Sequence, residues 1–202
     1  MADLKKAIVD PLWDQNPLTI QILGICSALA VTGKCMPAAT MAAGVTLVTA
    51  FANVIISSGR NWIPPKVKII IHLVVVAVLV IIADQILKAY AYDVSLTLSV
   101  FVGLIITNCI VLGRISAFAV ANPPVPSFFD GMSNGLGYGL VLMSVASFRE
   151  IFGSGTWFGI KGVMPEGYVL NGMVVLPSAA FFCIGALVWI QKSLTPKLVE
   201  KG

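Results

Sequence analysis

The run GLIITNCIVLGR, from Gly103 to Arg114, decides how this chain is interpreted, because it places a cysteine inside an uncharged stretch long enough to cross a bilayer. An earlier run, LGICSALAVTGK from Leu23 to Lys34, contains the same parts. Each has a glycine, a cysteine beside a small polar residue, aliphatic residues, and then a glycine followed by a base. We therefore interpret Cys26 and Cys109 as corresponding points of one duplicated unit.

The composition is that of an integral membrane protein. Of the 202 residues, 58% are hydrophobic and only 11% are charged, and the mean hydropathy is +0.95. A soluble domain carries about 25% charged residues, so this chain lacks the charge to coat a surface that faces water. The net charge of +4 comes from bases spread thinly at the ends of apolar runs, which argues against nucleic acid as a partner.

Uncharged intervals between charged residues predict six transmembrane helices. Roughly 20 apolar residues span a bilayer as a helix, and the third interval reaches that length once it is extended through Leu87. The loops between them are too short to be domains, so we expect one all-α membrane domain over residues 1–202. The intervals are Gln15–Gly33, Cys35–Gly59, Ile69–Ala83, Val94–Gly113, Gly131–Phe148 and Gly167–Gln191.

Six spans divide into two repeats of three, over about residues 15–92 and 93–202. Because three is odd, the second repeat must cross the membrane in the opposite sense to the first. Glycine-interrupted spans at matching positions of inverted repeats point to a site near the membrane midplane. The count of bases on alternate sides places both termini in the cytoplasm. The bases on the predicted cytoplasmic side are Lys5, Lys6, Arg60, Lys66, Lys68, Arg114, Lys192, Lys197 and Lys201, and those on the other side are Lys34, Lys88, Arg149 and Lys161.

The paired cysteines are the candidate metal ligands. A free cysteine in an apolar helix is usually a small hydrophobe, but Cys26 precedes Ser27, and Cys109 follows Thr107 and Asn108. Such polar groups are unfavourable in lipid unless they face a partner or a site. Two thiolates favour a metal that takes up their charge, and a [2Fe-2S] cluster usually needs four cysteines, so a second chain would have to supply another pair. The remaining cysteines, expected to be packing residues, are Cys35 and Cys183.

Glycines in the fifth interval predict close helix packing. Gly131, Gly135 and Gly139 recur every four residues and leave one helix face almost without side chains. The polar residues beside them, expected to form hydrogen bonds between helices rather than to line a polar path, are Asn134 and Tyr138.

The charged residues within or beside the spans are expected to be surface pairs. Asp84 and Lys88 are four residues apart and can pair on one helix face. A cation pathway is the alternative role for that carboxylate. Arg149 and Glu150 receive the same interpretation. His72 is the only histidine, and one histidine makes no haem or zinc site by itself.

Four stretches carry a resemblance to a known family over nearly the whole chain. The chain resembles the D-type members of the family that comprises the D and E subunits of the Na+-translocating NADH:quinone reductase and the A and E subunits of the Rnf electron-transport complex. The stretches are LGICSALAV from Leu23, DQILKAYAYD from Asp84, LSVFVGLIITNCIVLGR from Leu98, and PSFFDGMSNGLGYGLVLM from Pro126.

The resemblance implies a protein of the bacterial inner membrane that packs against its homologue, the E subunit, in inverted orientation. Between them the family holds an intramembrane [2Fe-2S] cluster, and the ligands from this chain would be Cys26 and Cys109. The six-subunit complex oxidises NADH, reduces ubiquinone and exports Na+. NADH, FAD and FMN would lie on other subunits, so we expect no catalytic residue on this chain.

Three other interpretations remain open at this point. An Rnf homologue would share the fold and the cluster but would pass electrons between ferredoxin and NAD. A secondary transporter would use the two cysteine segments as a substrate site near the midplane. A structural scaffold would need neither cysteine.

Overall fold

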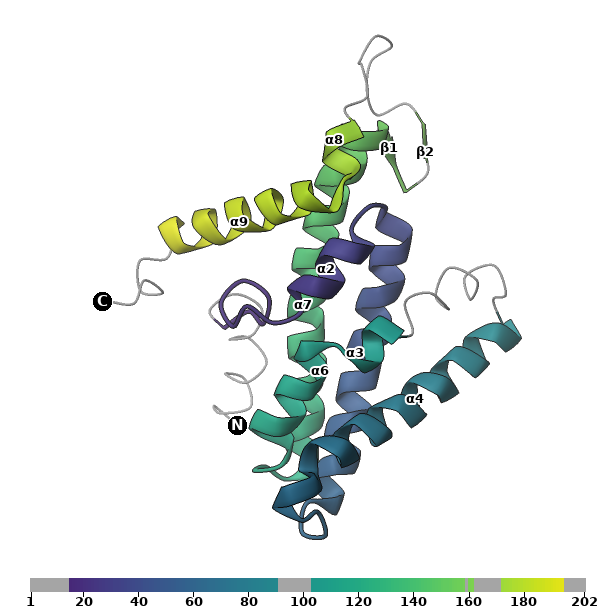
Figure 1. Cartoon of the computed structure of the whole chain (residues 1–202), viewed down its shortest axis with the longest axis vertical. Helices are drawn as coiled ribbons and strands as arrows, with labels where there is room; N and C mark the ends of the chain where they lie inside the picture. The colour runs from purple at the N-terminus through teal and green to yellow at the C-terminus, as the bar shows by residue number, and fades with distance from the viewer. Residues whose placement is uncertain (1–14, 91–102, 159, 162–171, 195–202) are drawn as a thin grey trace.

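The computed structural model describes residues 15–90, 103–158, 160–161 and 172–194, and these are helical apart from turns and one small antiparallel strand pair (Figure 1). The expectation of an all-α fold is confirmed for this part of the chain. The long helices are α3 (Cys35–Gly59), α4 (Lys68–Tyr90), α7 (Pro124–Ser154) and α9 (Pro177–Leu194). The shorter elements are α2 (Ile25–Val31), η2 (Pro65–Val67), α6 (Cys109–Arg114), the π-helical η3 (Ile115–Ala119), β1 (Thr156–Trp157), β2 (Ile160–Lys161) and α8 (Gly172–Val175).

Helices α3 and α7 lie side by side and form the centre of the molecule (Figure 1). The glycine face of α7 meets small residues of α3, as the spacing of the glycines predicts. A Cβ atom added at Gly135 would lie only 2.6 Å from the Thr46 Cα atom. The contacts run in opposite chain order, so the two helices are antiparallel. The contacting pairs are Gly131 with Ala50, Gly135 with Thr46, and Gly139 with Ala42.

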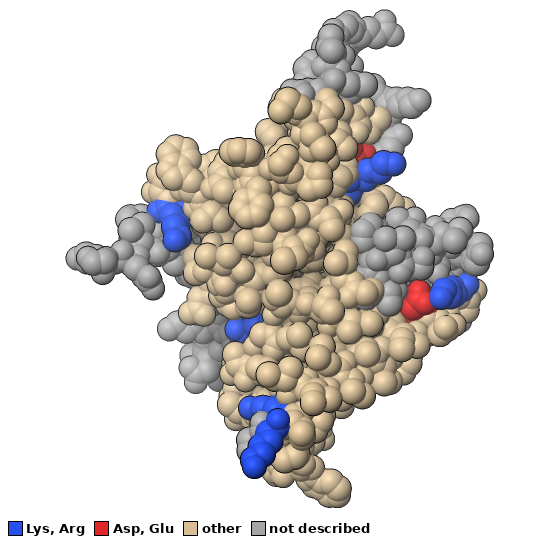
Figure 2. Space-filling view, in the orientation of Figure 1, with Lys and Arg blue, Asp and Glu red and all other residues tan. Residues whose placement is uncertain are grey.

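Helices α4 and α9 extend outward from this central pair on opposite sides (Figure 1). Within the described residues, three helices are long and apolar enough to cross a membrane: α3, α4 over Lys68–Ile86, and α9. Both outer helices expose many large apolar side chains, and charged side chains are sparse on the face that Figure 2 shows. The chain is therefore an all-helical, multi-pass membrane protein.

The two segments that contain Cys26 and Cys109 are broken helices, which the hydropathy pattern did not predict. The expected continuous helix over Gln15–Gly33 is wrong, because only the seven residues of α2 are helical and they follow a series of turns. Gly24 ends those turns with a φ of 79°, a left-handed conformation that glycine adopts without strain. In the second segment the backbone is extended at Asn108, and helix α6 begins at the next residue, Cys109.

We predict that Gly135→Ala destabilises the protein and that Gly185→Ala does not. The new methyl group at residue 135 would press on the backbone of α3, and overpacking of this kind costs about 1–3 kcal/mol. Gly185 lies on α9 with open space around it, so alanine there should be neutral or stabilising. Thermal unfolding of the detergent-solubilised variants measures the difference. Equal midpoints for the two variants would contradict the close contact between α3 and α7.

Candidate metal site

Cys26 and Cys109, 83 residues apart in the sequence, line the same small hollow. Its volume is about 30 Å³, and both cysteine residues are exposed and free. The structure therefore brings together the two residues that the sequence analysis singled out. The lining residues are Gly24, Cys26, Ser27, Leu104, Thr107, Asn108 and Cys109.

Each cysteine stands at the beginning of a short helix. Cys26 is the second residue of α2, and Cys109 is the first residue of α6. The side chain of Asn108 caps α6 by accepting a hydrogen bond of 3.1 Å from the backbone N–H of Ile110. Gly24 precedes α2 at a point where a Cβ atom would lie 2.7 Å from Ile110 Cδ1. The two helix starts are thus packed directly against each other.

A buried hydrogen-bond network forms part of the wall of the hollow, since Ser27 and Asn108 belong to both. Ser27 Oγ is 2.9 Å from the carbonyl oxygen of Gly24, 2.8 Å from Tyr138 Oη and 3.2 Å from Asn108 Nδ2. The network joins α2 and the cap of α6 to the central helix α7. The hydrogen bond between helices expected for Tyr138 is confirmed. The same expectation is wrong for Asn134, whose amide donates to Asp130 within α7.

This chain offers two thiols and no complete metal site within its described residues. No group of three or more His, Cys, Asp or Glu side chains comes together in that part of the chain. The only histidine, His72, is buried elsewhere, with Nδ1 3.4 Å from Ser116 Oγ. Two exposed thiols in one hollow fit a soft metal or an iron-sulfur cluster that takes its other ligands from another chain. A ligand role for Cys26 and Cys109 stays a prediction.

The other two cysteines lie outside this hollow. Cys35 is fully buried at the start of α3, and its Sγ atom is 3.7 Å from Ser147 Oγ. Cys183 is half-buried on α9, where it lines a groove next to Phe148 and Phe182. Both positions agree with their interpretation as packing residues.

The sequence pattern predicted a surface pair of Arg149 and Glu150. This prediction is wrong, because both side chains are buried. Arg149 donates to Thr32 Oγ1, at the C-terminal cap of α2, and to the backbone carbonyls of residues 174–176. Glu150 accepts the backbone N–H of Cys35 at 2.6 Å, at the start of α3. The cation and the carboxylate therefore lie at helix ends of opposite dipole sign, a favourable arrangement that sequence spacing does not reveal.

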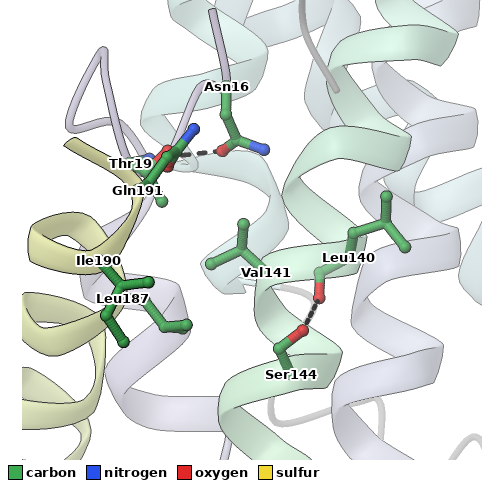
Figure 3. Close-up of a pocket in the computed structure, with 8 residues that line it drawn as sticks. All are labelled: Asn16, Thr19, Leu140, Val141, Ser144, Leu187, Ile190 and Gln191. Atoms are coloured by element: carbon green, nitrogen blue, oxygen red, sulfur yellow. Dashed lines mark hydrogen bonds between the residues drawn. The ribbon is translucent and has the colours of Figure 1, made fainter. Parts of the chain in front are cut away.

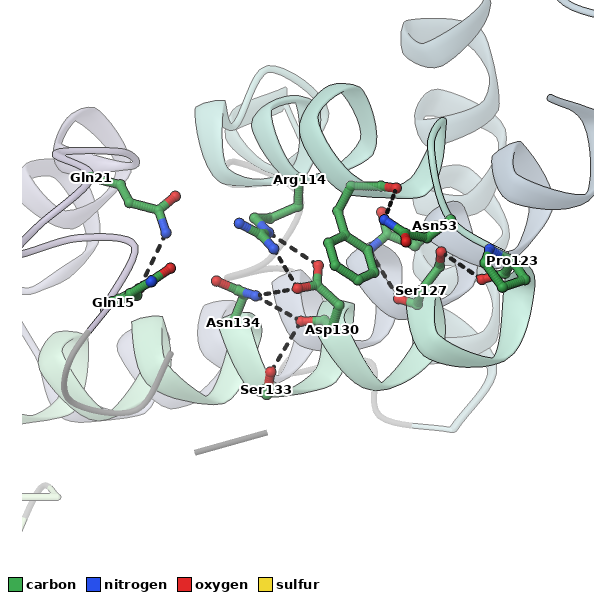
Figure 4. A network of polar contacts seen from close by, with 11 residues as sticks. Gln15, Gln21, Asn53, Arg114, Pro123, Ser127, Asp130, Ser133 and Asn134 are labelled. Atoms are coloured by element: carbon green, nitrogen blue, oxygen red, sulfur yellow. Dashed lines mark hydrogen bonds and ion pairs between the residues drawn. The ribbon is translucent and has the colours of Figure 1, made fainter. Parts of the chain in front are cut away.

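A second charged pair, Arg114 and Asp130, is a feature that the sequence analysis missed. Arg114 makes two hydrogen bonds to the buried carboxylate of Asp130, and one of them, from Nε to Oδ2, is 3.0 Å long (Figure 4). The pair joins the last residue of the Cys109 helix, α6, to α7. Asp84 and Lys88 do form the predicted ion pair on α4, with 2.6 Å between Lys88 Nζ and Asp84 Oδ2.

A larger groove lies between α7, α9 and the segment before α2 (Figure 3). Asn16, Thr19 and Gln191 lie together at one end, and Leu187 faces Val141 across the groove. Its volume is about 190 Å³, and none of its lining residues is a cysteine, a histidine or a charged residue. This groove therefore offers no side chain of the types that usually bind a metal, whereas the small hollow offers two cysteines.

The fold and the hollow define a class: an all-helical membrane protein in which two broken helices present two free thiols at one point of the surface. The chain also matches the family model described as Rnf-Nqr subunit, membrane protein, over residues 4–188. The chain belongs to this family.

Relatives from several bacteria match over nearly their whole length. The D subunit of the Na+-translocating NADH-quinone reductase of Aeromonas hydrophila is 54% identical, with 98% of this chain and 97% of the relative covered. The D subunit from Shewanella sp. strain W3-18-1 is 52% identical, with 98% and 96% covered. The D subunit from Proteus mirabilis is 52% identical, with 98% and 97% covered.

We predict that one dithiol-specific reagent bridges Cys26 and Cys109. Phenylarsine oxide, added to protein purified with an iron chelator, should bind these two thiols together because they line one hollow. Mass spectrometry of the labelled peptides identifies the bridged pair. The matched control is the pair Cys35 and Cys183, which should not be bridged. Independent labelling of Cys26 and Cys109 by two reagent molecules would contradict the shared hollow.

Proposed function

We propose that this chain is the D subunit of a Na+-translocating NADH:ubiquinone reductase. In this role it carries an electron through the membrane by way of a [2Fe-2S] cluster that it shares with the homologous E subunit. Cys26 and Cys109 supply half of the ligands, and two cysteines of the partner supply the rest. When bound, such a cluster accepts one electron and passes it on.

The observation that carries the proposal is the meeting of the two free cysteines in one hollow. Both are exposed, so a partner chain can reach them. The chain's own residues act as ligands and fix their positions, because Gly24 and the cap at Asn108 determine where the two short helices begin.

The relatives from other bacteria support the rest of the proposed role. The three proteins from Aeromonas, Shewanella and Proteus are all D subunits of the Na+-translocating reductase, which favours this complex over the Rnf alternative. Oxidation of NADH and reduction of ubiquinone then take place on other subunits, which also hold FAD and FMN. This chain contributes no catalytic residue of its own to those reactions.

The proposed architecture is six spans in two inverted repeats, with both termini in the cytoplasm of a bacterial cell and the chain in the inner membrane. The antiparallel contact of α3 with α7 supports inversion, since these helices hold corresponding places in the two repeats. The outward extension of α4 and α9 on opposite sides agrees with the same relation (Figure 1). Rocking of the two repeats around the cysteines would couple electron passage to Na+ export.

We predict that Cys26→Ala and Cys109→Ala each abolish the iron-sulfur chromophore that this chain shares, because each removes one of the two thiols in the hollow. The absorption spectrum and iron content of the purified complex measure this loss. Cys183→Ala is the matched control and should keep both. Quinone reductase activity should fall with the chromophore and stay normal in the control.

Two outcomes would favour other functions. If both alanine variants assemble and keep full quinone reductase activity, the chain is a scaffold. If the wild-type complex has iron in amounts that neither variant changes, the cysteine segments have another role, such as a substrate site.

A further inference from the structure

We propose that Tyr138 is a positioning residue for the pair Cys26 and Cys109. Its hydroxyl group fixes the position of α2 relative to α6, because it binds Ser27 of α2 and Ser27 in turn binds Asn108, the cap of α6. This inference rests on the proposed function for its electronic consequence, but its geometric part concerns only side chains of this chain. Nothing in the sequence pattern alone links Tyr138 to the cysteines, from which it is more than 25 residues distant in the chain.

The directions of the hydrogen bonds around Ser27 follow from the capacities of the groups. The carbonyl oxygen of Gly24 only accepts, so the single hydroxyl proton of Ser27 goes to it. Asn108 uses its oxygen to accept from Ile110, so its amide nitrogen faces Ser27 and donates. The remaining lone pair of Ser27 is left for Tyr138, whose hydroxyl group must therefore donate.

In this assignment the hydroxyl group of Ser27 donates its one proton and accepts two hydrogen bonds, and so it links three parts of the chain. Ser27 lies directly after Cys26, Asn108 lies directly before Cys109, and Tyr138 belongs to the central helix α7. All three side chains are buried, with exposed fractions of 3% or less. Each cysteine therefore has an immediate sequence neighbour tied to the same hydroxyl group, and α7 anchors that group.

The tyrosine ring supports the same arrangement by contact. A Cβ atom added at Gly24 would lie 3.3 Å from Tyr138 Cε2, so the ring packs against the turn that begins α2. Phenylalanine at residue 138 would keep this contact and remove only the donated hydrogen bond. Tyr138→Phe therefore tests the hydrogen bond without creating a cavity where the ring packs.

Loss of the hydrogen bond that Tyr138 donates should let the first residues of α2 and α6 move more freely relative to each other. In the cluster-free protein, bridging of Cys26 and Cys109 by phenylarsine oxide should slow about fivefold, the factor that corresponds to one ordinary hydrogen bond. In the intact complex, the midpoint potential of the cluster should shift, because groups behind the ligands tune the potential of an iron-sulfur centre.

The experiment compares four forms of the complete complex: wild type, Tyr138→Phe, Ser27→Ala and the control Ser144→Ala. Ser144 is also on α7, but its hydroxyl group donates only to Leu140 of its own helix. Potentials come from a redox titration followed by electron paramagnetic resonance, and bridging rates come from the same preparations after iron removal. We expect both readouts to change in the first two variants, more in Ser27→Ala, and neither to change in Ser144→Ala.

The double variant Tyr138→Phe/Ser27→Ala separates a shared network from independent effects. If Tyr138 acts through Ser27, the double variant should resemble Ser27→Ala alone. Unchanged potential and bridging rate in Tyr138→Phe would overturn the inference while leaving the proposed function intact. Absence of a cluster in the wild-type complex would instead overturn the proposed function, and the bridging rates would still decide whether Tyr138 positions the cysteines.

Discussion

The close contact between α3 and α7 is the constraint on which the rest of this structure depends. It exists because Gly131, Gly135 and Gly139 have no side chains where they meet the backbone of α3. In a membrane the hydrophobic effect does not drive helices together, because lipid tails are as apolar as the side chains. Van der Waals contact of this kind is therefore a main source of affinity between helices. The contact fixes α7 at the centre, and α7 then provides anchor points for the two short cysteine helices, α2 and α6.

Those anchor points lie along the length of α7. Near its start Asp130 binds Arg114 of α6, near its middle Tyr138 binds Ser27 of α2, and near its end Arg149 binds Thr32 at the end of α2. Both cysteine helices are too short to be stable alone, since isolated helices below about 12–15 residues are marginal. Their positions are therefore set by side chains of α7, and this makes a precise pair of thiols possible on two helical fragments.

The sequence predicted the features that depend on composition and local spacing. The membrane class follows from the scarcity of charge, the close packing from the four-residue glycine repeat, and the Asp84–Lys88 pair from its spacing along one helix. The pairing of Cys26 with Cys109 followed from the similarity of their surroundings. Hydropathy did not predict the helix breaks, because Gly24 and Asn108 act through backbone conformation and capping and hardly change the mean hydropathy. The burial of Arg149 and Glu150 was also missed, since the partners of Arg149 lie at least 25 residues away and the backbone N–H that Glu150 accepts belongs to another helix, α3.

The central claim is that two sulfur atoms from two broken helices face one metal centre together with a second chain. Electron cryomicroscopy of the intact complex tests it most directly, through the density around Cys26 Sγ and Cys109 Sγ. The account predicts one shared density within bonding distance of both atoms, closed on its far side by cysteines of the homologous partner. Sulfur atoms that point apart, or that face only acyl chains with no density between them, would contradict it.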